Sequence, residues 1–563
     1  MIKNRKDDYR VMNRKNGLMK NTLILAVSMV LTKIIGAVLK IPLANILGGM
    51  GMGYFSTAYS LFSPVYAFLS AGLPTVITKQ VAQAVACGKF RTVRKIKHTA
   101  LLISAVLGVV GSVFVLVSSA PFATYIANSD ESRFAIAAIA PSVFFCCIAA
   151  VYKGYYEGLY NMIPTAVSQV VESVVKAVLG LGLSYGAIIY FRQTGKSLEE
   201  CLPYGAAAAI MGVTVGEICG TLYLFLYSKL RSDGITKPEL LSSPYAPRKR
   251  TIGKRLIIEA LPISIGAVVA NLSSFVDLLT MPSGINACVK ENFSYFALSF
   301  PKAFDAVSSK EFGTFVYGSY TGIVTSLFML ISSTTALMGK SALPDIASAW
   351  GTENKQMLIR SIRILFSGVF VIGLPLCFML GIISEPALNL LYSVRQAEIE
   401  VSVLPLQILC FGGITIALSA AVFSVFQAIG RSELPVKMMM LCASLKLAGN
   451  LFFSQIPVLS VCSAAVSTVI AHLVISVIGI VLLKRTAQIK VGFVTLFGKP
   501  FAAAAVSSFV VYLTYEFILP NSLSKLIRVG ASAAAGGVVY LVMLVLFDRR
   551  ILKRFSAKAL AKK

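Results

Sequence analysis

Apolar runs of twenty or more residues recur along the whole chain, and they constrain its fold more than any other feature. A helix needs about 20 residues to cross the roughly 30 Å of hydrocarbon in a bilayer. Lipid offers no partners to backbone polar groups, so segments of this length that cross it are expected to be helical. We therefore predict an all-α polytopic membrane protein.

The composition agrees with this prediction. Charged residues make up 13% of the 563 residues, and the mean hydropathy is +0.79, whereas a soluble chain carries about 25% charged residues. About fourteen segments have the length and pattern of spanning helices, with residue ranges 22–47, 53–78, 99–126, 134–152, 164–190, 204–228, 256–281, 314–339, 362–383, 401–427, 435–454, 457–483, 495–518 and 524–547.

Lys and Arg are distributed unevenly between the loops. If the N-terminus is cytoplasmic, most of the 52 basic residues fall in the two tails and in the even-numbered loops, which are the cytoplasmic ones. We therefore expect the basic clusters at 91–97 and 247–255 to determine the orientation of the neighbouring spans and to contact anionic lipid. We expect both termini in the cytoplasm and no nucleic-acid partner, despite the net charge of +28.

Several classes of chemistry leave no pattern in the chain. The ten cysteines form no CxxC motif and only two His occur, so we expect no metal site. No nucleotide-binding fingerprint is present, and we expect no cofactor and no enzyme activity. The longest outer loop, about 282–313, has room for a short interfacial helix or a lid but lacks the clustered catalytic residues of a membrane polymerase.

A weak internal repeat organises the spans. Residues 155–176 and 425–446 share an aromatic position, a polar turn, a helix-starting Pro and a closing Lys. Since six helices separate the copies, the repeats run parallel, as in transporters whose binding site lies between two halves. The expected divisions are an N-tail (1–21), an N-lobe (22–228), a basic linker (229–255), a C-lobe (256–483), two further helices (484–547) and a C-tail (548–563).

Three lysines fall near the middle of spanning segments. Lys176 lies about 18 Å from the start of its helix, and Lys33 and Lys446 lie about 16 Å from theirs, at 1.5 Å per residue. A charge at such depth costs about 2.5–3.5 kcal/mol or more, so these side chains should face a wet cavity or partners. Ser168, Glu172 and Lys176 share one helix face. Glu172 and Lys176 either neutralise each other or line a substrate cavity.

Other polar residues in the spans are candidates for ion coupling or gating, or are packing partners near the membrane boundary. They are Glu217, Glu259, Asp277 and Asn271.

The segment "YKGYYEGLYNMIPTAVSQVVESVVK" (152–176) resembles the multidrug/oligosaccharidyl-lipid/polysaccharide exporter superfamily, in its polysaccharide biosynthesis, sporulation-protein and lipid II flippase branch. The stretches at 70–84 and 317–349 resemble the same branch. Lys153 and Glu157 depart from its usual Arg and Gln. The resemblance implies two six-helix lobes plus two extra C-terminal helices, a central cavity, alternating access, and a lipid-linked saccharide as cargo in a bacterial cytoplasmic membrane.

The expected function is thus a flippase for a lipid-linked oligosaccharide or a peptidoglycan precursor. Midplane lysines suit an anionic pyrophosphate cargo. The alternatives are a drug or cation antiporter of the same superfamily and a scaffold that recruits cell-wall synthesis enzymes.

Overall fold

The computed structural model describes residues 2–487, 492–520 and 522–547. It is 88% helical, and no strand occurs in these three ranges. The chain divides into two compact units, Met1–Leu278 and Leu279–Lys563, which we call the N-unit and the C-unit. The division falls inside one long helix, the seventh predicted span, so the placement of that span in a C-lobe starting at 256 stays a prediction.

The N-unit consists of helices α1 (Ile2–Ser70), α2 (Gly72–Ala86), α3 (Phe90–Val117), α4 (Ser119–Pro121), the π-helical segment η1 (Phe122–Ile126), α5 (Ser132–Gly158), α6 (Ile163–Gln193), α7 (Leu198–Leu230), α8 (Lys237–Ser242) and most of α9 (Lys249–Glu291). The C-unit continues with α10 (Phe293–Ser299), α11 (Pro301–Ala306), α12 (Phe312–Ser319), η2 (Tyr320–Val324), α13 (Thr325–Gly351), α14 (Lys355–Ile382), α15 (Ser384–Leu391), α16 (Gln396–Ala428), α17 (Glu433–Phe453), α18 (Pro457–Ser460), α19 (Ser463–Ala487), α20 (Phe493–Leu513), η3 (Thr514–Ile518) and α21 (Lys525–Phe547).

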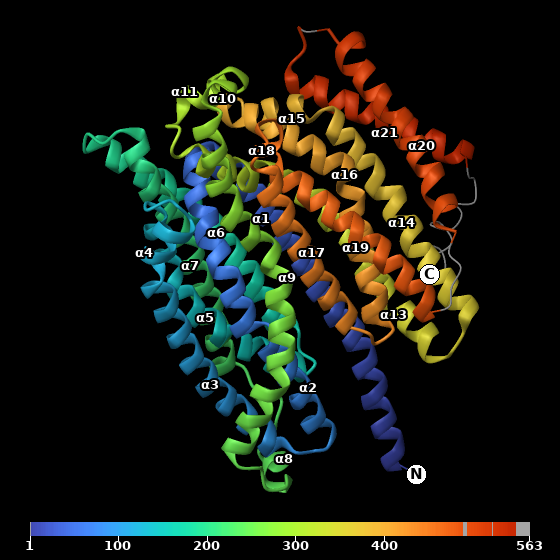
Figure 1. Cartoon of the computed structure of the whole chain (residues 1–563). Coiled ribbons are helices and arrows are strands. Elements are labelled where there is room, and N and C mark those ends of the chain that lie inside the picture. The colour runs from blue at the N-terminus through green and yellow to red at the C-terminus, as the bar shows by residue number, and fades with distance from the viewer. Residues whose placement is uncertain (1, 488–491, 521, 548–563) are drawn as a thin grey trace. The chain divides into compact units, whose positions relative to one another are not determined.

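The described residues contain 13 helical stretches long and apolar enough to cross a membrane. The first stretch, Val27–Ala86, has 60 residues, which at 1.5 Å each would extend about 90 Å, three times the hydrocarbon thickness. Gly48 interrupts it with a non-helical backbone, φ 64° and ψ −175°. Figure 1 shows α1 turning back on itself there, so this stretch makes two crossings and the predicted count of about fourteen is confirmed.

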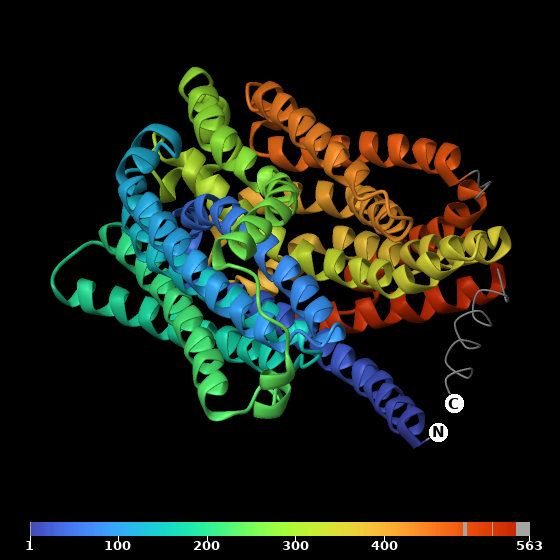
Figure 2. The ribbon, with the colours of Figure 1, turned by 90° about the horizontal axis from the view of Figure 1, so that it is seen from below.

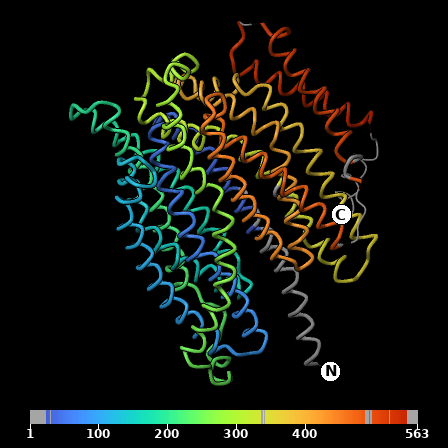
Figure 3. Tube along the Cα trace, viewed as in Figure 1, coloured from blue at the N-terminus to red at the C-terminus, as the bar shows by residue number. Residues whose placement is uncertain are grey.

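The two units repeat the same pattern of helix pairing. In the N-unit, α5 packs on α3 and α7, and α6 packs on α7; in the C-unit, α16 packs on α14 and α19, and α17 packs on α19. The predicted equivalence of the spans beginning near 164 and 435 therefore corresponds to α6 and α17. The long helices of each unit run alongside one another along most of their length (Figure 3).

The last two helices lie outside this repeated pattern. Within the C-unit, α20 packs on α14, and α21 packs on α20 and α15. Figure 2 shows the red helices beside the yellow α14. These are the two extra C-terminal helices expected from the sequence.

A stripe of glycines brings α6 and α7 into close contact. Gly212, Gly216 and Gly220 recur at every fourth position, which places them on one face of α7. A Cβ atom on Gly212 would lie 2.3 Å from the backbone nitrogen of Gly180, and one on Gly216 would lie 2.8 Å from the carbonyl oxygen of Glu172. Small residues in this spacing let membrane helices approach backbone to backbone, and here they set α7 directly against Glu172.

Candidate functional site

An ion pair joins α5 to α6 within the N-unit. The Lys153 Nζ atom lies 3.6 Å from Glu172 Oε2, and their side chains are only 17% and 22% exposed. Each helix is long and apolar enough to span a membrane. The attraction between these two largely buried opposite charges offsets much of the free-energy cost of removing them from water.

Glu217 of α7 joins this pair. Its carboxyl group interacts electrostatically with that of Glu172 and with the ammonium of Lys153. The glycine stripe explains the proximity, because a Cβ on Gly220 would lie 3.3 Å from the Glu172 Cβ. Three helices thus contribute one ammonium and two carboxyl groups to one place.

Lys176 lies one turn beyond Glu172 along α6 and contacts an aromatic ring. Its Nζ atom is 5.0 Å from the ring centroid of Tyr59 in α1, a cation–π distance. We call Tyr59, Lys153, Glu172, Lys176 and Glu217 the N-unit polar cluster. Lys40 of α1 also lies within electrostatic range of Lys176, so a third ammonium group borders this cluster, beside those of Lys153 and Lys176.

The structure corrects the interpretation that Glu172 and Lys176 neutralise each other as an ion pair. These residues share a helix face, but the ion pair of Glu172 is with Lys153 on the neighbouring helix, and Lys176 is directed to Tyr59. Helix packing brings Lys153 closer to the carboxylate than the i+4 neighbour. Ser168 is fully buried, and its hydroxyl donates a hydrogen bond to the Thr165 carbonyl of the same helix at 2.9 Å.

The C-unit has a buried polar group on the equivalent helix, α17. Lys446 is 4% exposed. One turn on, Asn450 donates from Nδ2 to Thr280 Oγ1 at 2.8 Å and accepts a hydrogen bond from Ser467. We call Lys446, Asn450, Thr280 and Ser467 the C-unit polar cluster. It ties α17 to α19 and to the C-unit part of α9.

A histidine near this cluster escaped the sequence reasoning. His472 Nδ1 lies 2.8 Å from Ser419 Oγ, which links α19 to α16, and His472 interacts electrostatically with Lys446. Neither His472 nor Lys153 was selected as a site residue from the sequence. Both are polar residues within or directly beside apolar runs, and this is the signal by which they could have been found.

The remaining candidate residues occupy separate places. Lys33 lies in α1 with an exposed side chain. Glu259 pairs with Arg255 at 2.7 Å and with Lys79 at 3.1 Å, as expected for a residue near the membrane boundary. Asn271 accepts from Ser63 Oγ at 2.7 Å, which joins α9 to α1. Asp277 is buried, 6% exposed, and has partners of its own.

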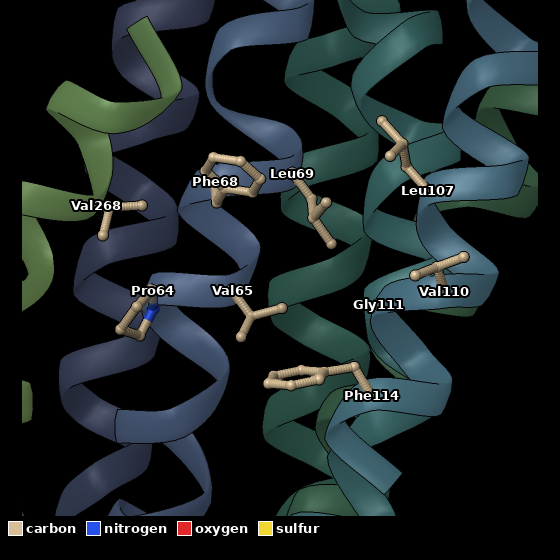
Figure 4. Close-up of a pocket in the computed structure, with 9 residues that line it drawn as sticks. All are labelled: Pro64, Val65, Phe68, Leu69, Leu107, Val110, Gly111, Phe114 and Val268. Atoms are coloured by element: carbon tan, nitrogen blue, oxygen red, sulfur yellow. The ribbon is translucent and has the colours of Figure 1, made fainter. Parts of the chain in front are cut away.

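An apolar pocket of about 490 Å³ lies in the N-unit among α1, α3 and α9. Figure 4 shows its lining, which includes Pro64, Phe68, Leu107, Phe114 and Val268. No charged side chain lines it, so it is separate from the N-unit polar cluster. In the described part of the chain, no group of three or more His, Cys, Asp or Glu side chains has the arrangement of a metal site.

The described residues contain thirteen helical stretches that can span a membrane, in two units with matching helix pairings, and this is the architecture of a polytopic membrane transporter. A family model described as polysaccharide biosynthesis protein matches residues 18–350, more than half of the chain, and the chain belongs to this family.

Two curated relatives and one solved structure extend the comparison over nearly the whole length. Stage V sporulation protein B of Bacillus subtilis (strain 168) is 23% identical over 96% of this chain and 97% of its own. Lipid II flippase MurJ of the same organism is 21% identical over 93% and 94%. The structure "Lipid II flippase MurJ, inward closed conformation" aligns with a TM-score of 0.67 and 14% identity over 94% of this chain and 100% of that one. The resemblance to the flippase branch of the exporter superfamily is confirmed.

Proposed function

We propose that this protein moves a lipid-linked oligosaccharide or peptidoglycan precursor from the inner to the outer leaflet by alternating access, without covalent chemistry. The observation that carries the proposal is a lysine on each of two equivalent membrane helices, Lys176 on α6 and Lys446 on α17. The similarity to a lipid II flippase and to a sporulation protein of the same family supports it.

The electrostatic argument concerns the head group. A pyrophosphate-linked lipid carries about two negative charges, and an ammonium attracts them strongly where the dielectric constant is low. Glu172 has Lys153 as its ion-pair partner, which leaves the ammonium of Lys176, held at a cation–π distance, available for an anion. We propose that Lys33, Lys176 and Lys446 face a common cavity, with Ser168 and Glu172 near its wall.

The alternatives make different demands on the same residues. A drug or cation antiporter would need an acidic or aromatic cavity, and the two carboxyl groups Glu172 and Glu217 favour it in part, although Lys153 offsets one of them. A scaffold for cell-wall enzymes would tolerate loss of the lysines. No catalytic step is required by any of the three.

The cellular setting follows from the flippase proposal. The protein would lie in the bacterial cytoplasmic membrane with both termini in the cytoplasm. A membrane potential or an ion gradient would bias the cycle, and Glu217, Asn271, Glu259 and Asp277 are the residues we would test first for coupling or gating.

Binding measurements on purified protein test the cargo. Native mass spectrometry with lipid II and with a neutral polyprenol should show adducts of the anionic lipid at far lower concentration. The Lys446→Gln protein should lose this preference, while Lys302→Gln, on the short exposed helix α11, should keep it. Equal binding of the two lipids by the unaltered protein would refute the proposal.

A further inference from the structure

The connection between α7 and α9, residues 231–248, is fixed on the first turns of α3. The Arg91 backbone N–H donates to Ser243 Oγ at 3.1 Å, and Arg91 Nε donates to the Leu240 carbonyl at 2.9 Å. Lys95 Nζ donates to the Ala246 carbonyl at 3.3 Å. This connection, which we call the strap, includes α8, at the lower end of Figure 1, and it has a defined conformation.

The two acidic residues of the strap already have partners within the N-unit. Asp233 accepts a hydrogen bond from the Tyr155 hydroxyl at 3.0 Å and pairs with Arg94 at 3.7 Å. Glu239 caps α8, because its Oε2 accepts from the backbone N–H of Thr236 at 2.8 Å. Both carboxylates are therefore committed to internal contacts.

The strap has an inner and an outer side. Ile235, Ser243 and Ala246 are buried. Leu241 and Tyr245 are 76% and 86% exposed. They lie four residues apart, at the end of α8 and just beyond it, so this connection exposes two large apolar side chains next to its basic residues.

Basic residues flank these two groups along the chain, and another, on α3, contacts Tyr245. Lys95 Nζ lies 5.6 Å from the Tyr245 ring centroid. The exposed cations on the strap and the first turns of α9 are Arg231, Lys237, Arg248, Lys249, Arg250, Lys254 and Arg255. Apolar side chains bordered by Lys and Arg are the composition of protein segments that lie on anionic membrane surfaces.

The covalent connections of the strap place it at the membrane boundary. It joins α7, which ends at Leu230, to α9, which begins at Lys249, and both helices can span a membrane. A short connection between two spans leaves and re-enters the bilayer on one face, which places the strap at the level of the lipid head groups.

We propose that the strap is a docking surface for anionic phospholipid head groups. Leu241 and Tyr245 insert between the head groups and the adjoining part of the acyl chains, and Arg248, Lys249 and Arg250 pair with lipid phosphates. The strap shares no residue with the N-unit or the C-unit polar cluster, and it gives the N-unit a preference for an acidic bilayer that does not depend on transport.

Tryptophan fluorescence tests the proposal in the full-length protein. The chain has one Trp, Trp350, so Trp350→Phe combined with Tyr245→Trp carries a single reporter, and Leu241→Trp gives an independent second one. In nanodiscs containing phosphatidylglycerol we expect blue-shifted emission, quenching by lipids brominated near the head group, and protection from acrylamide. In purely zwitterionic nanodiscs each effect should be several-fold smaller.

The charge dependence has its own matched control. Arg248→Gln, Lys249→Gln and Arg250→Gln together should abolish the difference between the two nanodiscs, whereas Lys302→Gln with Lys310→Gln, exposed cations outside the strap, should leave it unchanged. A reporter equally open to acrylamide in both bilayers overturns the proposal. So does equal protection in both, which would indicate an apolar contact without charge selection, and so does protection that requires an added protein. None of these readouts involves transport, so failure here leaves the flippase proposal standing.

Discussion

Lys153 and Glu172 join two membrane helices, α5 and α6, through atoms 3.6 Å apart. The contact holds a carboxylate that is also next to Glu217. Without the Lys153 ammonium, two acidic groups would lie next to each other in a low-dielectric place with no ion-pair partner, so this lysine stabilises the N-unit polar cluster.

We therefore expect Lys153→Gln to destabilise the protein by about 2–4 kcal/mol, since removing one partner leaves an uncompensated buried charge. Thermal unfolding of detergent-solubilised protein measures the loss. The double change Lys153→Gln with Glu172→Gln should recover most of it. Lys79→Gln, which removes an exposed partner of Glu259, is the control, and an equal effect of both single changes would contradict the buried-pair account.

Lys176→Gln should be tolerated by the fold, because Glu172 keeps Lys153 as its ion-pair partner. Affinity for an anionic lipid-linked head group should fall about tenfold, the loss of one charge-assisted contact of roughly 1.5 kcal/mol. Titration of lipid II by native mass spectrometry, beside a melting curve, separates the two effects. Unchanged affinity would mean that Lys176 serves only its contact with Tyr59.

Gly212→Ala should loosen the α6–α7 contact, since its Cβ would lie 2.3 Å from a backbone nitrogen. We expect a loss of about 1–3 kcal/mol from this overpacking. Gly182→Ala on α6 is the matched control, because nothing lies within 4 Å of its added Cβ. If both variants melt at the same temperature, the backbones of the two helices are not in contact.

The orientation predicted from Lys and Arg can be measured with one native residue. Cys87, between α2 and α3, is exposed, and the other nine cysteines are buried or half-buried. In intact cells, a membrane-impermeant maleimide should leave Cys87 unlabelled and should label Lys302→Cys in a Cys87→Ser background. Labelling of both positions from outside would invalidate the predicted topology.

The fold was largely predictable because hydropathy alone limits where helices can lie. Helix α6 was expected over 164–190 and spans Ile163–Gln193, and α17 was expected over 435–454 and spans Glu433–Phe453. The interior of each helix is dictated by its apolar length, which the sequence displays directly.

The contacts of the polar clusters were harder to predict. Spacing along α6 puts Lys176 one turn from Glu172, but the rotation and axial offset of α5 decide that Lys153 is the ion-pair partner. In the same way, Asn450 meets Thr280, 170 residues away. Such pairs depend on how helices dock, and the α6–α7 docking itself depends on glycines that hydropathy does not single out.

The reversal at Gly48 has a consequence for how the chain is threaded through the bilayer. Each crossing changes the side on which the next loop emerges, so one turn decides the parity of every later loop. With a side chain that disfavours the left-handed φ of 64°, α1 would tend to continue straight. All downstream connections would then be directed to the opposite face, and the strap with its cluster of basic residues would have to be translocated. A single glycine thus links the local backbone conformation of α1 to the insertion pathway of the whole molecule.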